Sequence, residues 1–181
     1  MSTTAHILAI SGSLRAGSSN TALLRAAARL APAGVEVALY AGLGGLPHFN
    51  PDRDDDGDPA VADLRARLRA ADAVLISTPE YAHGVPGSLK NALDWVVGSG
   101  ELVDRPVGIL HASRSTWALN SIRETLTVMS AKVLPEASVV LELASNRIDE
   151  DGVLADPGLA GRVGDVVAAL ARAAAALRAG A

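Results

Sequence analysis

The sequence contains no cysteine, no long run of basic residues and no uninterrupted apolar stretch of membrane-spanning length. Without cysteine there can be no disulfide framework, no thiolate nucleophile and no Cys-ligated metal. A formal net charge of -4 argues against a surface for the phosphate backbone of DNA or RNA. Met1 to Ala5 is short and uncharged and leads directly into a predicted strand. We therefore expect a cytoplasmic protein that is neither secreted nor bound to a membrane.

The length and hydrophobic content are those of one folded unit. The chain has 181 residues, of which 49% are hydrophobic. A chain of this length buries one good core, and the usual range of domain sizes favours one domain over two. We therefore expect residues 1–181 to form a single domain.

Apolar strand patterns alternate with helical patterns along the chain. Strands are expected at 6–11, 35–40, 74–77, 107–111 and within 133–143, and helices at 21–30, 60–71, 87–97, 116–131 and 157–178. Right-handed crossovers between such strands place helices on both faces of a parallel sheet. The five units fit an α/β three-layer sandwich whose five-stranded parallel sheet has the flavodoxin-like order 2-1-3-4-5.

A loop rich in hydroxyl groups follows the first predicted strand and leads into the first helix. We call it the phosphate loop, and it reads Gly12-Ser13-Leu14-Arg15-Ala16-Gly17-Ser18-Ser19-Asn20-Thr21. Backbone N–H groups and the positive end of a helix dipole favour a phosphate, to which hydroxyl groups and an arginine add hydrogen bonds. The spacing is neither a P-loop nor a Rossmann fingerprint, which favours a single phosphate monoester. The residues expected to bind it are Ser13, Arg15, Ser18, Ser19, Asn20 and Thr21.

A simpler interpretation of this loop is helix capping. Ser18, Ser19 or Asn20 could merely cap the first helix, as such residues often do. Arg15 favours the phosphate, because a plain cap has no need of a cation beside the positive end of a helix.

A second, rigid loop follows the third predicted strand. Pro79 and Pro86 stiffen it, and Gly87 permits a sharp turn or a close approach of the backbone. Ligands of open α/β sheets bind at such strand ends. His83 lies in this loop and His111 ends the fourth strand, but neither has a local partner for a catalytic dyad. We interpret both histidines as loop or packing residues.

Three segments resemble the NADPH-dependent FMN reductase family of flavodoxin-like proteins. Residues 79–95 resemble the family pattern P-E-Y-N-x-x-x-P-G-x-L-K-N-x-x-D-W. Residues 12–20 match its phosphate-binding pattern G-S-x-R-x-x-S-x-N, and residues 46–52 resemble its linker after the second strand. The likeness is close in the first half of the chain and holds only in pattern beyond it.

The resemblance implies bound FMN, with NADPH or NADH as electron donor and a flavin, quinone, azo compound or similar small molecule as acceptor. The FMN phosphate would bind at the phosphate loop and the isoalloxazine ring against residues 79–84, which we call the ring loop. Flavin carries the redox chemistry itself, so no catalytic acid or base is expected. Backbone N–H groups of the ring loop would hydrogen-bond the ring edge. The residues implied there are Pro79, Glu80, Tyr81, Ala82, His83 and Gly84, with Ser113 after the fourth strand.

Two departures from the family pattern fall in this site. Ala82 stands where the family has asparagine, so a side-chain contact to the ring is lost there. After the fourth strand the family often has a glycine-containing loop, whereas residues 112–118, which we call the wall loop, read Ala-Ser-Arg-Ser-Thr-Trp-Ala. Residues 113–115 can still donate hydrogen bonds, while Trp117 either shields the ring or simply packs.

Several other side chains receive structural interpretations. Glu80 is expected to be a solvated loop carboxylate, and Lys90 and Asp94 to form an i,i+4 ion pair on a helix surface. Trp95 is interpreted as a residue of the core or of a subunit interface.

The segment Asp52 to Gly57 imitates the start of a calcium loop, and Asp63 stands where the final carboxylate would be. An EF-hand needs a helix before its loop and normally ends in Glu, whereas Pro51 precedes this segment and Pro59 interrupts it. We expect a solvated acidic loop.

The predicted helix at 87–97 suggests an assembly of several chains. It carries apolar residues around more than one face, so one stripe can pack on the sheet and the rest needs another partner: Leu89, Leu93, Trp95 and Val96. We expect a homodimer or homotetramer in which the segment 47–56 of a neighbour walls the flavin.

Two other functions stay open. A flavodoxin-like electron-transfer protein would exchange electrons with protein partners without NAD(P)H turnover, but such a carrier is expected to have a T-x-T-G-x-T loop and a more acidic surface. A family member that has lost its flavin could serve as a scaffold, because fold alone does not fix function.

Overall fold

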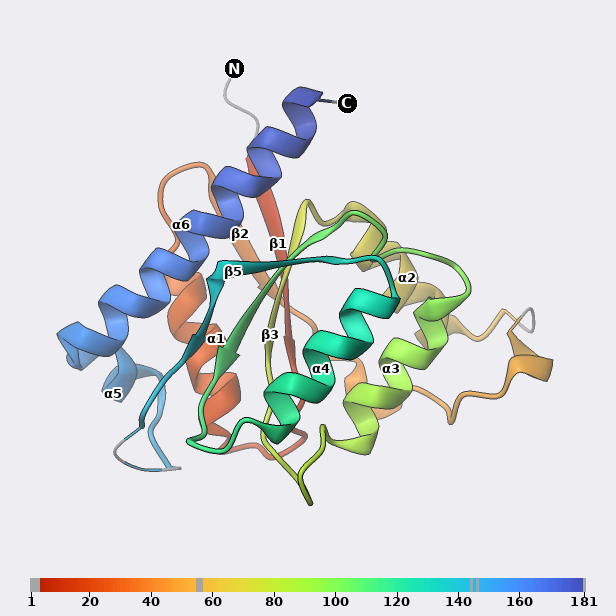
Figure 1. The fold of residues 1–181 in the computed structure, drawn as a ribbon, viewed down its shortest axis with the longest axis horizontal. Coiled ribbons are helices and arrows are strands. Elements are labelled where there is room, and N and C mark those ends of the chain that lie inside the picture. Colours follow the sequence, from red (N-terminus) through yellow and green to blue (C-terminus); the bar gives the residue numbers. More distant parts are fainter. Residues whose placement is uncertain (1–3, 55–56, 144, 146, 181) are drawn as a thin grey trace.

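Helices and strands alternate along the chain, as the sequence predicts (Figure 1). The computed structural model describes residues 4–54, 57–143, 145 and 147–180. The strands are β1 (Ala5–Ser11), β2 (Val35–Leu39), β3 (Ala73–Ser77), β4 (Pro106–His111) and β5 (Lys132–Val140). The helices are α1 (Ser19–Arg29), α2 (Pro59–Ala70), α3 (Gly87–Val97), α4 (Trp117–Val128), α5 (Glu150–Ala155) and α6 (Pro157–Gly180), with 3₁₀ turns at Leu43–Gly45 and Pro51–Arg53. Over these described ranges, no helix combines the length and apolar character needed to cross a membrane.

The five strands form one parallel sheet in the order β2-β1-β3-β4-β5. This arrangement confirms the expected flavodoxin-like order. Because the strands are parallel, the loops that follow β1, β3 and β4 gather at one end of the sheet, at the bottom of Figure 1. These are the phosphate loop, the ring loop and the wall loop, and such strand ends are where ligands of open α/β sheets bind.

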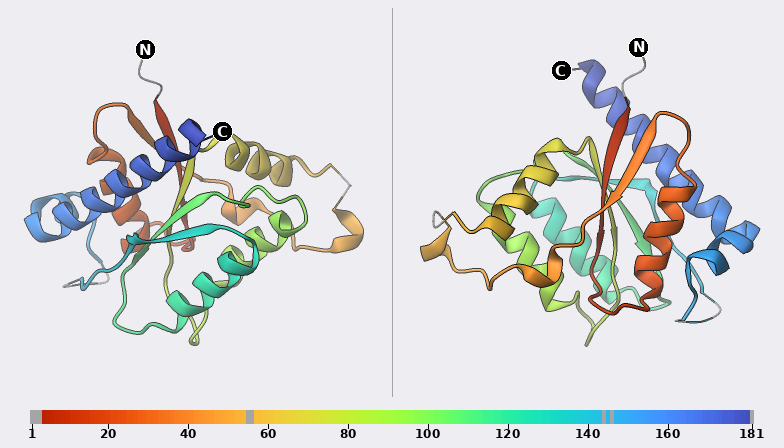
Figure 2. Two further views of the ribbon diagram at one scale, coloured as in Figure 1. Left: turned by 45° about the horizontal axis from the view of Figure 1, so that its top comes forward. Right: turned by 180° about the vertical axis from the view of Figure 1, so that it is seen from behind.

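Alternating side chains of the sheet enter two separate hydrophobic clusters. In β1, Ile7 and Ala9 pack on one face of the sheet, and Leu8 and Ile10 pack on the other. Helices α1, α5 and α6 cover the first face, and α2, α3 and α4 cover the second (Figure 2). The central strand β3 is buried at every position, which explains its continuous apolar run.

The second half of the chain departs from the predicted elements in two places. The short helix α5 was not predicted; the Asp149 carboxylate caps it by accepting a hydrogen bond from the Gly152 N–H at 2.9 Å. Helix α4 ends at Val128, before the expected Ala131, because Ser130 adopts a left-handed conformation with φ of 60°.

The four apolar side chains of α3 that were expected to need another subunit are buried within the chain, so that expectation is wrong: Leu89, Leu93, Trp95 and Val96. Trp95 is 2% exposed and packs edge-to-face on Phe49, with ring centroids 5.1 Å apart. Its indole N–H donates to the Pro47 carbonyl at 2.8 Å, and the Asn91 side chain accepts from the Phe49 N–H at 2.8 Å. The segment 47–49 therefore covers α3 of its own chain, and Trp95 is confirmed as a core residue.

Candidate functional site

The start of α1 provides free backbone donors. Ser18 caps the helix: its hydroxyl accepts from the Thr21 N–H at 3.5 Å, and its carbonyl accepts from the Ala22 N–H at 2.9 Å. Among the described residues, nothing accepts a hydrogen bond from the N–H groups of Ser19 and Asn20. First-turn N–H groups at the positive end of a helix bind anions such as phosphate.

Most side chains of the phosphate loop are engaged inside the protein. The Asn20 Oδ1 accepts from the Ser77 hydroxyl at 3.0 Å, and the Thr21 Oγ1 lies 2.8 Å from the Ser11 Oγ. The capping alternative is confirmed for Ser18. These side chains therefore shape the loop, and they leave the backbone N–H groups as its principal donors.

Ser13 and Arg15 lie on the outer part of the phosphate loop. The Ser13 hydroxyl accepts from the Arg15 N–H at 3.3 Å, and Arg15 itself is exposed. An exposed guanidinium next to free helix-start N–H groups completes a site for an anion.

Gly12 brings the phosphate loop against the end of β3. Its N–H donates to the Ser77 carbonyl at 2.8 Å. A Cβ at this position would lie 2.3 Å from the Thr78 Oγ1 and 3.1 Å from the Leu89 Cδ2. Because only glycine leaves room for this approach, the phosphate loop and the start of the ring loop meet directly.

The ring loop is a tight turn with an unfavourable backbone. Tyr81 and Gly84 exchange two N–H···O=C bonds of 2.9 Å, and between them Ala82 and His83 have φ of 49° and 61°. Positive φ at both central residues defines a type I′ turn, for which Asn and Gly are preferred. Ala82, which replaces the family's asparagine, therefore strains this turn.

Glu80 joins the ring loop to the wall loop, so its interpretation as a solvated carboxylate is wrong. Its carboxylate accepts from the Ala118 N–H at 2.9 Å and from the Ser115 hydroxyl at 2.5 Å. The bond from Ala118, followed by the bond from Ser115, lowers the pKa of Glu80. Ser115 and Ala118 lie 35 and 38 positions further along the chain, and no local signal in the sequence connects them to Glu80.

Trp117 makes a second connection between the wall loop and the ring loop. Its indole stacks on the His83 imidazole, with ring centroids 5.2 Å apart and an interplanar angle of 20°. Trp117 stays 60% exposed, so the stack lies at the rim of the site. Within the wall loop, the Ser113 hydroxyl accepts from the Ser115 N–H at 3.1 Å.

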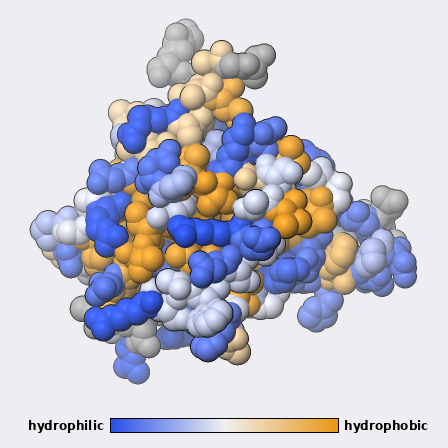
Figure 3. Space-filling view, viewed as in Figure 1, coloured by the Kyte–Doolittle hydropathy of each residue, from blue (hydrophilic) through white to orange (hydrophobic). Residues whose placement is uncertain are grey.

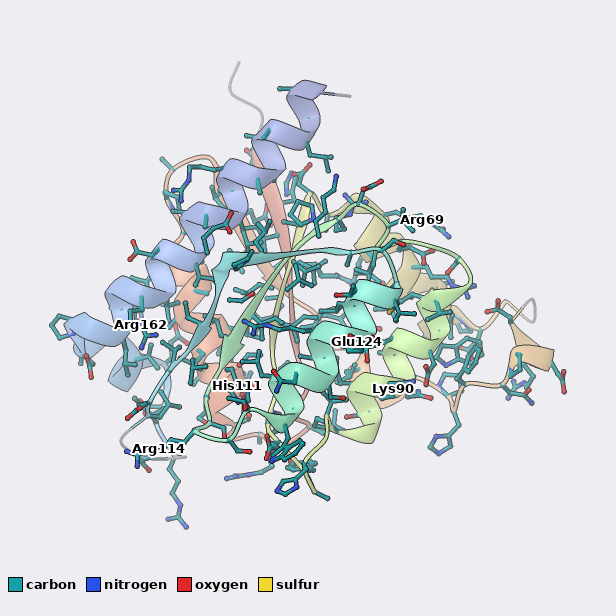
Figure 4. The ribbon with its side chains drawn as sticks, in the orientation of Figure 1. Arg69, Lys90, His111, Arg114, Glu124 and Arg162 are labelled. Atoms are coloured by element: carbon teal, nitrogen blue, oxygen red, sulfur yellow. The ribbon has the colours of Figure 1, made fainter. Side chains whose placement is uncertain are left out.

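His111 is buried at the end of β4, as a packing residue would be. Its Nε2 lies 2.5 Å from the Ser115 carbonyl oxygen, and its Nδ1 has no hydrogen-bond partner within the described ranges. Figure 4 labels His111 at the end of β4 and Arg114 in the wall loop that follows it. His111 thus supports the wall loop at the residue that also binds Glu80.

Two carboxylates of the calcium-like pattern, those of Asp54 and Asp63, pair with arginines. Asp54 pairs with Arg65 at 2.5 Å, and Asp63 pairs with Arg67 at 2.9 Å. Residues 55–56 of this segment lie outside the described residues. In the described part of the chain, no group of three His, Asp or Glu side chains forms a candidate metal site. On α3, the expected Lys90–Asp94 ion pair is confirmed.

Known proteins resemble this chain over most of its length. The family model of NADPH-dependent FMN reductase matches residues 5–146. The chain is 39% identical over 163 residues to an NAD(P)H-dependent FMN reductase of Pseudomonas aeruginosa, covering 86% of this chain and 88% of that protein. It is 32% identical over 170 residues to a quinone reductase of Escherichia coli, covering 87% of this chain and 89% of that protein.

The same relationship is visible in three dimensions. The structure of FerB, a flavoenzyme NAD(P)H:(acceptor) oxidoreductase from Paracoccus denitrificans, matches with a TM-score of 0.77 and 26% identity, covering 96% of this chain and 98% of that one. The family match begins at β1 and ends beyond β5, so it includes all three loops of the site. The chain belongs to the NADPH-dependent FMN reductase family.

Proposed function

We propose that this FMN-dependent NAD(P)H oxidoreductase passes electrons to quinones or similar small aromatic acceptors. The observation that carries the proposal is the meeting of three loops at one sheet edge: free helix-start N–H groups with Arg15 lie in one loop, and the strained ring loop lies beside it. The relatives support it, since they include an NAD(P)H-dependent FMN reductase and a quinone reductase.

The phosphate loop is proposed to hold the FMN phosphate. The N–H groups of Ser19 and Asn20 lie at the positive end of α1, and Arg15 adds a charge-assisted hydrogen bond. Ser13, Ser18 and Thr21 support this arrangement through hydrogen bonds inside the loop. In this proposal the backbone N–H groups and Arg15 donate hydrogen bonds to the phosphate, and the other side chains of the loop hold those donors in place.

The ring loop and the wall loop are proposed to surround the isoalloxazine ring. FMN supplies the redox chemistry when bound, and the chain positions it and leaves one ring face open. Glu80 takes part through its backbone, because its carboxylate is held by the wall loop. Tyr81 and Trp117 are 53% and 60% exposed and offer flat apolar surfaces to an aromatic acceptor. The remaining residues proposed to contact the ring are Pro79, Ala82, His83, Gly84 and Ser113.

Visible absorption and steady-state turnover test this function. We expect the purified protein to carry or take up FMN, and to oxidise NADPH or NADH when 1,4-benzoquinone is present. A flavin-loaded protein that oxidises neither nicotinamide would support an electron-transfer protein instead. A folded protein that takes up no FMN would support the scaffold. Either outcome overturns the proposal.

We further propose that the protein is cytoplasmic and forms a homodimer or homotetramer. The lack of cysteine suits a reducing compartment. Val103 and Val128 are 52% and 75% exposed, and the Asp104 N–H donates to the Ser130 carbonyl at 2.9 Å, which places their segments side by side. Figure 3 shows hydrophobic surface on the face that carries β5 and α4. A specific interface buries at least about 1,000 Å²; light scattering that gives the mass of one chain would overturn this assembly.

A further inference from the structure

A cavity of about 580 Å³ lies beside the phosphate loop. It is bounded by residues 13–16 of that loop, by Thr21 and Arg25 of α1, and by the segment 39–44 that ends β2 and continues beyond it. β2 and β3 lie on opposite sides of β1, so the cavity and the ring loop flank the phosphate loop from two sides. The right-hand view of Figure 2 shows β2 and the chain after it alongside β1 and α1.

Two arginines give this cavity its charge. Arg15 and Arg25 line it, and none of the described residues that line it is Asp or Glu. Within the described ranges neither guanidinium forms an ion pair, whereas Arg29, one turn further along α1, pairs with Asp151 at 3.0 Å. Burial raises the pKa of Tyr40, so this lining phenol stays neutral. Because Arg15 is already assigned to the FMN phosphate, Arg25 is the lining guanidinium that stays available in the cavity for a second anion.

A phosphate ester attached to an apolar group fits these walls. Arginine binds phosphate oxygens through paired hydrogen bonds. The hydroxyl-bearing residues Ser13 and Thr21 also line the cavity, and Leu14, Leu39 and Leu43 add apolar surface for a base and a sugar. The proposed FMN phosphate binds at the start of α1, so an anion in the cavity would be a second phosphate group.

The position of the cavity identifies the molecule that could bring this second phosphate. The ring loop follows β3 and the cavity lies between the ends of β1 and β2, so about one and a half strand spacings, or about 7 Å, separate them along the sheet edge. An extended dinucleotide with its nicotinamide at the flavin ring reaches over that distance to its adenosine. We infer that the cavity binds the 2′-phosphate at the adenosine end of NADPH and that Arg25 determines the preference for NADPH over NADH. This inference rests on the proposed function.

Calorimetry on the FMN-loaded protein tests the cavity directly, with 2′,5′-ADP and 5′-AMP as probes. We expect the native protein to bind 2′,5′-ADP at least about tenfold more tightly, and Arg25→Gln to weaken that binding by about tenfold to a hundredfold, the range for a lost hydrogen bond to a charged group. In turnover, Arg25→Gln should raise KM for NADPH by a similar factor and leave KM for NADH and the affinity for FMN unchanged. The matched control is Arg29→Gln, on the same helix but outside the cavity, which should change none of these quantities.

Three results would overturn the inference: equal affinity of the native protein for the two nucleotides, loss of FMN affinity in Arg25→Gln, or an equal rise of KM for NADPH and NADH. Failure of the proposed function has a different signature. If neither dinucleotide is oxidised, the reductase proposal fails, and the calorimetric comparison of 2′,5′-ADP with 5′-AMP still decides whether the cavity is a phosphate site.

Discussion

The phosphate loop and the ring loop lie next to each other at the sheet edge, but different parts of the chain hold them in shape. The cap of the phosphate loop is local, since Ser18 bonds to Thr21 within the same segment. The ring loop is anchored from the wall loop, where Ser115 binds Glu80 from 35 positions away. A local cap depends on its own sequence, whereas a remote anchor depends on the sheet order that brings its partner near.

The two loops also differ in backbone strain. Residues 12–21 have no positive φ, whereas Ala82 and His83 of the ring loop both do. Strained turns persist only where the surrounding structure holds them, and they are common at functional sites. The Glu80 hydrogen bonds and the His83–Trp117 stack are therefore the contacts that hold the ring loop in this conformation.

The largest effect should come from Gly12→Ala, which separates the two loops. The new Cβ would lie 2.3 Å from the Thr78 Oγ1, so one of the loops must shift. We expect the free energy of unfolding to fall by about 3 kcal/mol, at the upper end for overpacking. Urea denaturation measures this change, and FMN affinity should fall with it. Gly17→Ala is the control in the same loop, because its Cβ meets nothing within 4 Å; a similar loss in both variants would contradict the packing argument.

Arg15→Ala tests the phosphate loop alone. We expect FMN binding to weaken by about 1.5–3 kcal/mol, the usual contribution of a hydrogen bond to a charged group. Riboflavin, which lacks the phosphate, should bind the variant and the native protein equally well. Fluorescence titration with both ligands gives the comparison, and equal losses for FMN and riboflavin would contradict the phosphate assignment.

Ala82→Gly tests the strain of the ring loop. Glycine accepts positive φ without the steric cost that alanine bears, so we expect the free energy of unfolding to rise by about 0.5–1 kcal/mol. The control is Ala66→Gly on the exposed side of α2, where the same substitution should lower stability by about 1 kcal/mol. The two variants should thus shift the urea midpoint in opposite directions; a decrease in both would mean that the turn is not strained.

The smallest effect is expected from Glu80→Gln, because glutamine keeps the shape and one acceptor oxygen. The pKa of Glu80 is lowered in the folded protein, so its ionised form stabilises the fold above the ordinary glutamate pKa, and this contribution is lost as the pH falls through the lowered value. Melting temperatures of the native protein and the variant should therefore differ at neutral pH, begin to converge below about pH 4.3, and coincide once the pH is below the lowered pKa of Glu80. Glu124→Gln, on the exposed side of α4, is the control for removing a charge without those hydrogen bonds. A difference for Glu80→Gln that does not change with pH would show that ionisation is not involved.

The sequence by itself determined the features that depend on short spacings along the chain. The alternation of apolar strands and helices predicts a parallel sheet with helices on both faces, and the observed order β2-β1-β3-β4-β5 fits that pattern. The cap at Ser18 and the Lys90–Asp94 ion pair join residues three and four positions apart, which a helix always brings together. The family patterns that include Gly12 and Arg15 also lie within continuous segments, and the family match confirms the relationship.

Only the tertiary structure decided which distant segments meet. The sequence predicts that Glu80 is a solvated carboxylate. In the structure β3 and β4 are neighbours, so the wall loop lies beside Glu80 and binds its carboxylate. The sequence left Trp95 as a residue of either the core or a subunit interface, and the structure shows that the segment 47–49 covers it. The cavity at Arg25 exists only because β2 pairs with β1. In each case the contacts join groups that lie far apart in the chain. Those groups meet because of the way the chain folds around the paired strands, which no local spacing encodes.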